Sequence, residues 1–138
     1  MAARSLHDFQ GKWQIDRRID DLAAGKVAVL QGQASFTPSA GGLDYLETGK
    51  LVLEDAAPIH AERRYSWQLS GGQIAVFFED GRPFHSFDPK LERASARHLC
   101  DPDDYRVIYS FGRWPVWRTE WRVQGPRKHY RMTTEYHR

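Results

Sequence analysis

The chain lacks most of the sequence signals that mark membrane proteins, secreted proteins and the common enzyme classes. Its 138 residues include a single cysteine, Cys100, which excludes an internal disulfide and favours a cytoplasmic location. No run of about 18 apolar residues occurs, so no membrane association is expected. Residues 1–8 have no apolar centre, and no signal peptide is predicted. P-loop, dinucleotide-binding and Gly-x-Ser-x-Gly motifs are also missing, so nothing indicates nucleotide binding or serine hydrolysis.

The chain also lacks internal repeats, low-complexity tracts and linkers. We therefore expect one domain over residues 1–138. A domain of this length buries about two-thirds of the surface of its unfolded chain, which is enough for a core without disulfides. Aromatic residues make up 13% of the sequence, and they need an interior in which to pack.

What the sequence does contain is alternation of apolar and polar residues. In residues 9–19, Trp13, Ile15 and Ile19 share one parity, which is typical of a half-buried strand, and Gly11 allows a bend just before it. Similar segments follow at residues 27–37, 43–53, 59–69, 74–78, 84–87, 105–111, 117–123 and 130–136. Residues 90–100 fit either a strand or a short helical turn. About ten strands without a convincing helix predict an all-β fold, a single antiparallel up-and-down barrel. An immunoglobulin-like sandwich is the alternative, weakened by the missing second cysteine.

Several short motifs occur together along the chain. They are Gly11-x-Trp13, Phe36-Thr37-Pro38, HAERRY at residues 60–65, Phe84-His85-x-Phe87-Asp88, His98-Leu99-Cys100 and Trp114-Pro115-x-Trp117. This combination resembles a small bacterial family of unknown function, DUF6314, over nearly the whole chain, and Gly-x-Trp at a first strand is similar to the start of lipocalin-like (calycin) barrels. The resemblance implies a calycin-like barrel and no particular activity. It also implies an arginine from late in the chain, Arg131 or Arg138, lying across Trp13.

Haem is the one cofactor that the resemblance brings into consideration. Nitrobindin-like barrels, which are similar in architecture, bind haem through a histidine. Their first strand carries extra glycines after the tryptophan, whereas positions 15 and 17 here are Ile and Arg. The cofactor therefore stays unknown, with haem as a minority hypothesis.

Charged residues on apolar parities are the strongest indication of a site. Arg17, Glu47 and Arg63 each fall among residues expected to point inward, and buried charges need a partner or a ligand. One interpretation is an internal network in which Glu47 pairs with Arg63. The other is a polar anchor inside an apolar ligand pocket. The predicted ligand-binding set is Arg17, Glu47, Arg63, Tyr65, His85, His98, Tyr105 and Trp117.

Metal binding and covalent catalysis find little support. His98 and Cys100 would face the same way on a strand, as paired metal ligands do, but no spacing supplies a third ligand, so no metal is predicted. The same pair is a poor nucleophile and base, because residues two apart on a strand point alike. Catalytic residues therefore remain unknown.

The last quarter of the chain is basic. Residues 105–138 contain eight Lys/Arg and two Glu, which fits either solvent-facing strand surfaces or an interaction surface. The preceding residues carry more acidic than basic groups, so no nucleic-acid partner is expected. Our leading hypothesis is a monomeric or homodimeric barrel whose cavity binds a small, partly apolar molecule, neutral or anionic. The alternatives are an isomerase or hydrolase, cofactor-free or haem-assisted, in the same cavity, and a protein-interaction module on the basic strands.

Overall fold

The computed structural model describes residues 4–54 and 56–138, and over these the chain forms ten strands and one short 3-10 helix. The elements are η1 (Leu6–Phe9), β1 (Gly11–Asp21), β2 (Lys26–Ser39), β3 (Gly42–Leu53), β4 (Ile59–Ser70), β5 (Gln73–Phe78), β6 (Pro83–Phe87), β7 (Arg93–Cys100), β8 (Asp103–Arg113), β9 (Val116–Gln124) and β10 (His129–His137). No helix among these described residues is long and apolar enough to span a membrane.

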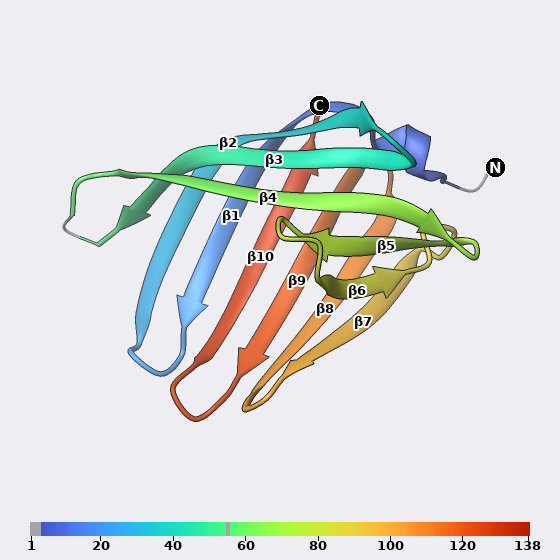
Figure 1. Cartoon of the computed structure of the whole chain (residues 1–138). Coiled ribbons are helices and arrows are strands. Elements are labelled where there is room, and N and C mark those ends of the chain that lie inside the picture. The colour runs from blue at the N-terminus through green and yellow to red at the C-terminus, as the bar shows by residue number, and fades with distance from the viewer. Residues whose placement is uncertain (1–3, 55) are drawn as a thin grey trace.

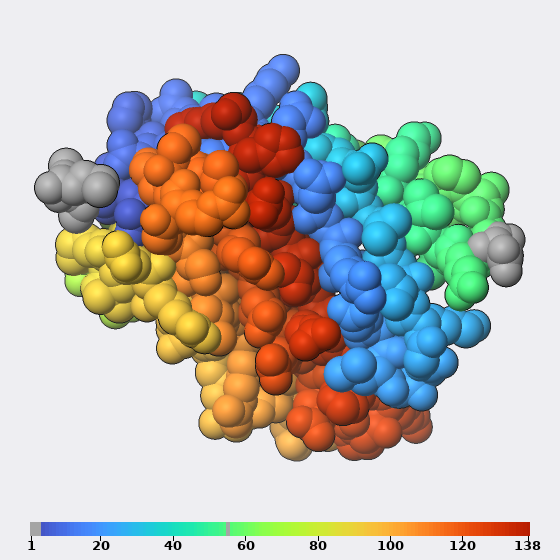
Figure 2. All heavy atoms as spheres, turned by 180° about the vertical axis from the view of Figure 1, so that it is seen from behind, coloured from blue at the N-terminus to red at the C-terminus, as the bar shows by residue number. Residues whose placement is uncertain are grey.

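The ten strands form one antiparallel sheet that curls into a nearly closed barrel (Figure 1). Their order is β6-β5-β4-β3-β2-β1-β10-β9-β8-β7, so each strand lies beside its neighbour in sequence except where β1 pairs with β10. The edge strands β6 and β7 lie side by side without forming a ladder. The back of the molecule shows β7 to β10 followed by β1 and β2 as a continuous wall (Figure 2). The predicted all-β up-and-down barrel is confirmed.

Alternation along β1 sets which residues face the interior. Trp13, Ile15 and Arg17 are buried and the residues between them are exposed, because successive side chains of a strand point to opposite faces. Gly11 has a φ of 113°, a conformation that favours glycine, and it turns the chain from η1 into the strand.

One end of the barrel is closed by aromatic packing. Phe9 of η1 is fully buried and its ring meets the edges of Trp67, Trp114 and Trp117 at centroid distances of 5.1–5.3 Å. The Arg138 guanidinium lies 3.8 Å from the centroid of the Trp13 ring. Arg138 therefore covers the tryptophan, as the resemblance implied.

Arg138 also ties the end of the chain to its beginning, because it donates hydrogen bonds to the carbonyl oxygens of Gln10 and Asp8 at 2.8 and 3.0 Å. Arg131, the other candidate, instead pairs with Asp20 on the outer face.

Two local features differ from the predictions, and the structure decides a third that was left open. The 3-10 helix η1 was not expected, because four residues are too few to show a helical period. Strand β2 continues through Pro38, where a break was predicted. Residues 90–100, left open between strand and helix, form a turn followed by β7.

Candidate ligand-binding cavity

A cavity of about 270 Å³ lies inside the barrel beyond the aromatic closed end. Inward side chains of nine strands line it, and β2 contributes none. All eight residues of the predicted set are on its wall: Arg17, Glu47, Arg63, Tyr65, His85, His98, Tyr105 and Trp117. Their place on the wall follows from strand parity, while their role in binding stays a prediction.

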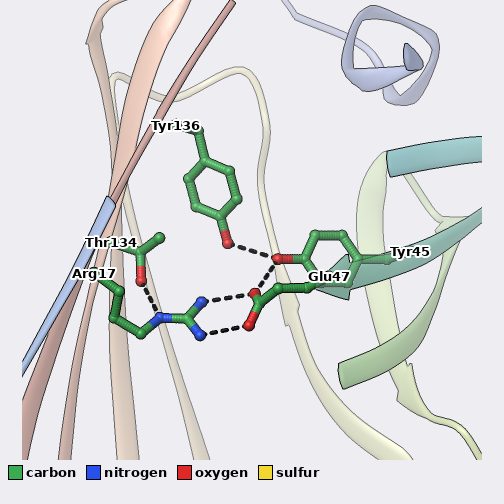
Figure 3. A network of polar contacts seen from close by, with 5 residues as sticks. All are labelled: Arg17, Tyr45, Glu47, Thr134 and Tyr136. Atoms are coloured by element: carbon green, nitrogen blue, oxygen red, sulfur yellow. Dashed lines mark hydrogen bonds and ion pairs between the residues drawn. The ribbon is translucent and has the colours of Figure 1, made fainter. Parts of the chain in front are cut away.

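The floor of the cavity is a buried network around Glu47 (Figure 3). Arg17 donates two hydrogen bonds to the Glu47 carboxylate, at 2.5 and 2.7 Å, and its Nε donates to the Thr134 hydroxyl at 2.7 Å. Tyr45 donates to Glu47 Oε1 at 2.6 Å, and its hydroxyl lies 3.0 Å from that of Tyr136. Since the Tyr45 proton is directed at the carboxylate, Tyr136 is the donor to Tyr45.

Small residues on β2 make this network possible. Arg17 is on β1 and Glu47 on β3, with β2 between them. At this level β2 presents Gly32 and Ala34, paired with Gly49 and Glu47 of β3. A Cβ on Gly32 would lie only 2.0 Å from the Thr48 carbonyl oxygen, so the strands approach too closely there for any other residue. The small surface leaves room for the guanidinium to reach β3.

The network holds its charges firmly. Burial by itself would raise the pKa of Glu47, but hydrogen bonds and charge from Arg17 outweigh it, and the pKa lies below its usual value. Burial likewise opposes the charge of Arg17, yet Glu47 raises the pKa of the guanidinium further. Burial raises the pKa of Tyr136 to about 12 and that of Tyr45 well above its usual value, so both phenols stay protonated and serve as donors.

A second polar pair sits beside the floor. The Nε2 atom of His85 is 2.7 Å from the Tyr109 hydroxyl, and its Nδ1 has no hydrogen-bond partner within the described part of the chain. Burial, with a smaller contribution from the charge of His98, lowers the pKa of His85 to about 3. The imidazole is therefore neutral at neutral pH and adds no charge to the cavity.

Other polar groups on the wall have no protein partner among residues 4–54 and 56–138. They include Arg63, Tyr65, His98, Thr119, Tyr130 and the indole Nε1 of Trp117, all of which line the cavity without a hydrogen bond or ion pair. Pairing of Glu47 with Arg63, one of the two interpretations of the sequence, is wrong. Arg63 is opposite Glu47 in the β3–β4 register, but it is exposed toward the open end, and Arg17 occupies both carboxylate oxygens.

Two comparisons with known proteins, one by sequence and one by structure, find matches for this chain. The model of a family of unknown function, DUF6314, matches residues 9–138. The chain belongs to DUF6314. Among solved structures, the chain is similar to the S-type phycobiliprotein lyase CPES from Guillardia theta, with a TM-score of 0.63 over 95% of this chain and 87% of that one. Sequence identity is 6%, so the likeness concerns the fold alone. No curated protein matches the chain.

The histidines of this DUF6314 chain do not form a metal or haem site. No group of three or more His, Cys, Asp or Glu within the described ranges could hold a metal ion. The Nε2 atom of His85 is engaged by Tyr109, and His98 is wedged against Phe78 and Phe84 at ring distances of 5.6 and 5.2 Å. A cavity of about 270 Å³ is also smaller than the roughly 300–1,000 Å³ of pockets for drug-sized ligands. The residues present do not fit haem.

The described residues of the DUF6314 cavity do not place a free carboxylate beside a histidine, as one form of acid–base catalysis requires. Among the described residues, Glu47 is the one carboxylate on the wall, and Arg17 and Tyr45 occupy both of its oxygens. No carboxylate contacts His85 or His98 in the described part of the chain. A general base needs hydrogen-bond reach of a substrate proton, and the Glu47 carboxylate is instead engaged by Arg17 and Tyr45.

The basic last quarter lies mostly on the outer face of β8 to β10. There Arg106, Arg122 and Arg131 each contact a carboxylate: Asp104, Glu120 and Asp20 respectively. Ion pairing on a solvated face neutralises much of the excess charge that the sequence suggests. The interaction-module hypothesis gains no distinct patch from this arrangement.

Sequence reasoning missed part of the wall, and it missed Thr134 of the buried network beneath it. Tyr45, Tyr136 and Thr134 complete the floor, and Tyr109 binds His85. Tyr45 and Tyr109 share inward parity with the selected residues Glu47 and Tyr105 of their own strands, and Thr134 and Tyr136 lie on the inward parity of β10, so the signal existed. Strand parity does not give the position of a residue along the barrel axis. That position decides whether an inward side chain packs in the aromatic core or lines the cavity.

Proposed function

We propose that the barrel binds a small, partly apolar molecule that carries an anionic group, and that Arg63 receives the anion. The observation that carries this proposal is the contrast between two inward arginines. Arg17 is buried and bound on both sides by Glu47 and Thr134. Arg63 lines the same cavity without a hydrogen bond or ion pair in the described part of the chain.

The charge balance of the wall favours an anion. Glu47 neutralises Arg17, and His85 is neutral because burial lowers its pKa to about 3. Arg63 is then an uncompensated cation at the open side of the cavity. A guanidinium binds a carboxylate through paired hydrogen bonds, which are among the strongest that proteins form.

Hydroxyl donors close to Arg63 support the same conclusion. Tyr65 lies two residues further along β4 on the same face, and Tyr130 is half-buried at the mouth. Burial raises the pKa of Tyr130, so its phenol keeps its proton and can donate. Donors without partners are matched by a ligand rich in acceptor oxygens.

Isothermal titration calorimetry with charged and uncharged probes tests this proposal. The probes are 2-naphthoate and octanoate, each compared with its own amide. We expect at least one acid to bind about tenfold or more tightly than its amide, because a hydrogen bond to a charged group contributes about 1.5–3 kcal/mol. Arg63→Met should remove that difference with little change in thermal stability.

Arg64→Met is the matched control. Arg64 is the next residue of β4, faces outward and approaches Glu62 and Glu79 at 3.8 Å. It should keep the full preference for acids. Equal affinity for acids and amides, or an Arg63→Met protein that still prefers acids, would refute the proposal.

A further inference from the structure

We infer that the cavity selects flat aromatic acids, with the aromatic part of the ligand stacked in the barrel below a carboxylate at Arg63. This inference rests on the proposed function and adds a ligand class to it. It depends on the composition of the wall, on the orientation of its rings and on the distance from those rings to Arg63.

The wall is made of rings rather than aliphatic chains. Of its 21 residues, eleven are Phe, Tyr or Trp, and three are aliphatic: Val76, Val123 and Met132. All six tyrosines of the sequence belong to the wall. Aromatic rings attract other rings in offset-stacked or edge-to-face arrangements, which adds about 0.5–1.5 kcal/mol beyond the burial of area. An aliphatic ligand gains only the burial.

Three of these rings form a parallel stack that runs from β5 and β6 across the barrel to β9. Phe84 of β6 stacks on Phe78 of β5 at 4.3 Å and 22°, and on Trp121 of β9 at 5.0 Å and 11°. Tyr65 of β4 is within 25° of the same plane at 5.8 Å. All four rings are half-buried and line the cavity. Because these ring planes are nearly parallel, a flat ligand can pack against them in one orientation, parallel to the rings.

Among the described residues, the stack ends on Trp121 without a further stacked ring or cation. Beyond Phe78 lies the Arg82 guanidinium, 5.5 Å from the ring centroid. At the other end, Trp121 has one stacked partner, Phe84, and meets His85 only edge-on at 5.1 Å and 80°. No second ring stacks on Trp121 within the described part of the chain. A ligand ring parallel to Trp121 would continue the stack.

The position of Arg63 sets the distance between anion and ring. Arg63 and Tyr65 lie two residues apart on the same face of β4, a rise of roughly 7 Å along the strand. A carboxylate attached directly to a ring system therefore reaches Arg63 while its ring lies level with Tyr65 and the stack. The cavity volume of about 270 Å³ limits the ligand to one or two fused rings, since drug-sized molecules occupy pockets from roughly 300 Å³ upward.

The same four probes separate this inference from the proposed function. The comparison of each acid with its amide tests the anion, and the comparison of naphthyl with octyl compounds tests the aromatic preference. We expect 2-naphthoate to bind roughly three- to tenfold more tightly than octanoate, from the stacking contribution. Fluorescence of the tryptophans should be quenched on binding, since Trp121 would contact the ligand.

Two variants locate the preference. Trp121→Leu should reduce the ratio of naphthyl to octyl affinities toward one and leave the preference for acids over amides intact. Trp114→Leu is the control, because Trp114 packs against Phe9 and Trp13 away from the cavity, and it should keep both preferences. Where Trp121→Leu does not fold, Phe84→Leu tests the same stack and should lower the same ratio.

Each outcome decides between the two claims. Equal binding of 2-naphthoate and octanoate, both tighter than their amides, overturns the aromatic inference and keeps the anion proposal. Naphthyl compounds that bind better than octyl compounds, with no difference between acid and amide, keep the aromatic inference and overturn the anion site. A ratio unchanged by Trp121→Leu overturns the assignment to the stack, and no binding by any probe overturns both claims.

Discussion

Replacement of Arg17 by methionine tests the network on which the cavity floor depends. Methionine keeps much of the side-chain length and removes the charge. The change leaves the Glu47 carboxylate, whose side chain is 3% exposed, with Tyr45 as its remaining partner. Breaking a buried pair by removing one member costs roughly 3–5 kcal/mol, because the other charge is stranded.

That magnitude is large beside the stability of a single domain, which is typically about 5–15 kcal/mol. For a chain of this size it corresponds to a fall in Tm of roughly 10–20 °C. The double variant Arg17→Met with Glu47→Gln should recover much of the loss, because no buried charge then remains. The recovery distinguishes a stranded charge from a simple loss of packing.

The loss should also depend on pH. In the native protein the pKa of Glu47 is lowered. Its ionised carboxylate therefore contributes to stability at pH values above the pKa of Glu47 in the unfolded chain, and this contribution is lost as pH falls. Without Arg17, burial dominates and raises the pKa of Glu47 instead. The penalty of Arg17→Met is then fully present at pH 7.5 and decreases at pH 5, where the carboxyl group takes up a proton.

Urea denaturation followed by tryptophan fluorescence measures these differences at both pH values. Arg18→Met is the control, since Arg18 is the next residue of β1, faces outward and pairs with Asp20 on the surface. It should cost less than about 1 kcal/mol. The reasoning is refuted if Arg17→Met is as stable as Arg18→Met, or if the double variant is no more stable than Arg17→Met alone.

Two further predictions concern buried and terminal contacts. The pKa of His85 falls from about 6.5 in the unfolded chain to about 3 on folding. The free energy of unfolding should therefore drop as pH falls below 6.5, by on the order of 2 kcal/mol at pH 5. The variant His85→Gln cannot titrate and should lack this part of the pH dependence in matched urea titrations. Arg138→Ala should lower the free energy of unfolding by about 1–2 kcal/mol, because it removes the cation over Trp13 and the hydrogen bonds to Asp8 and Gln10. A Tm equal to that of the native protein would show that these contacts do not hold the end of the chain.

Strand parity explains why most of the fold was accessible from the sequence. Trp13, Ile15 and Arg17 alternate with exposed residues in β1 as expected, and a one-residue error in parity would have placed every inward residue outside. The short helix η1 was not apparent from the sequence because its burial depends on Phe9 meeting rings from distant strands. Such contacts are set by tertiary packing, which a local pattern does not contain.

The partner of Glu47 was inaccessible for a related reason. Arg63 is directly opposite Glu47 on the adjacent strand, and from the sequence it is the natural partner. Arg17 reaches the carboxylate across β2, because Gly32 and Ala34 leave space between β1 and β3. Only the register of three strands together reveals that space, and two residues of inward parity can differ in depth by a whole layer.

The pairing of Glu47 with Arg17 instead of Arg63 also determines which charges the cavity presents. A barrel in which Glu47 bound Arg63 would hold its charged pair near the open end and leave Arg17 as an unpaired charge deep inside, which is costly. In the arrangement observed, the deep arginine is neutralised by Glu47, which also accepts a hydrogen bond from Tyr45, and the exposed arginine is solvated. The anion proposed at Arg63 would therefore break no internal pair, and the stacked rings of Phe84 and Trp121 are the surface proposed for the rest of the ligand.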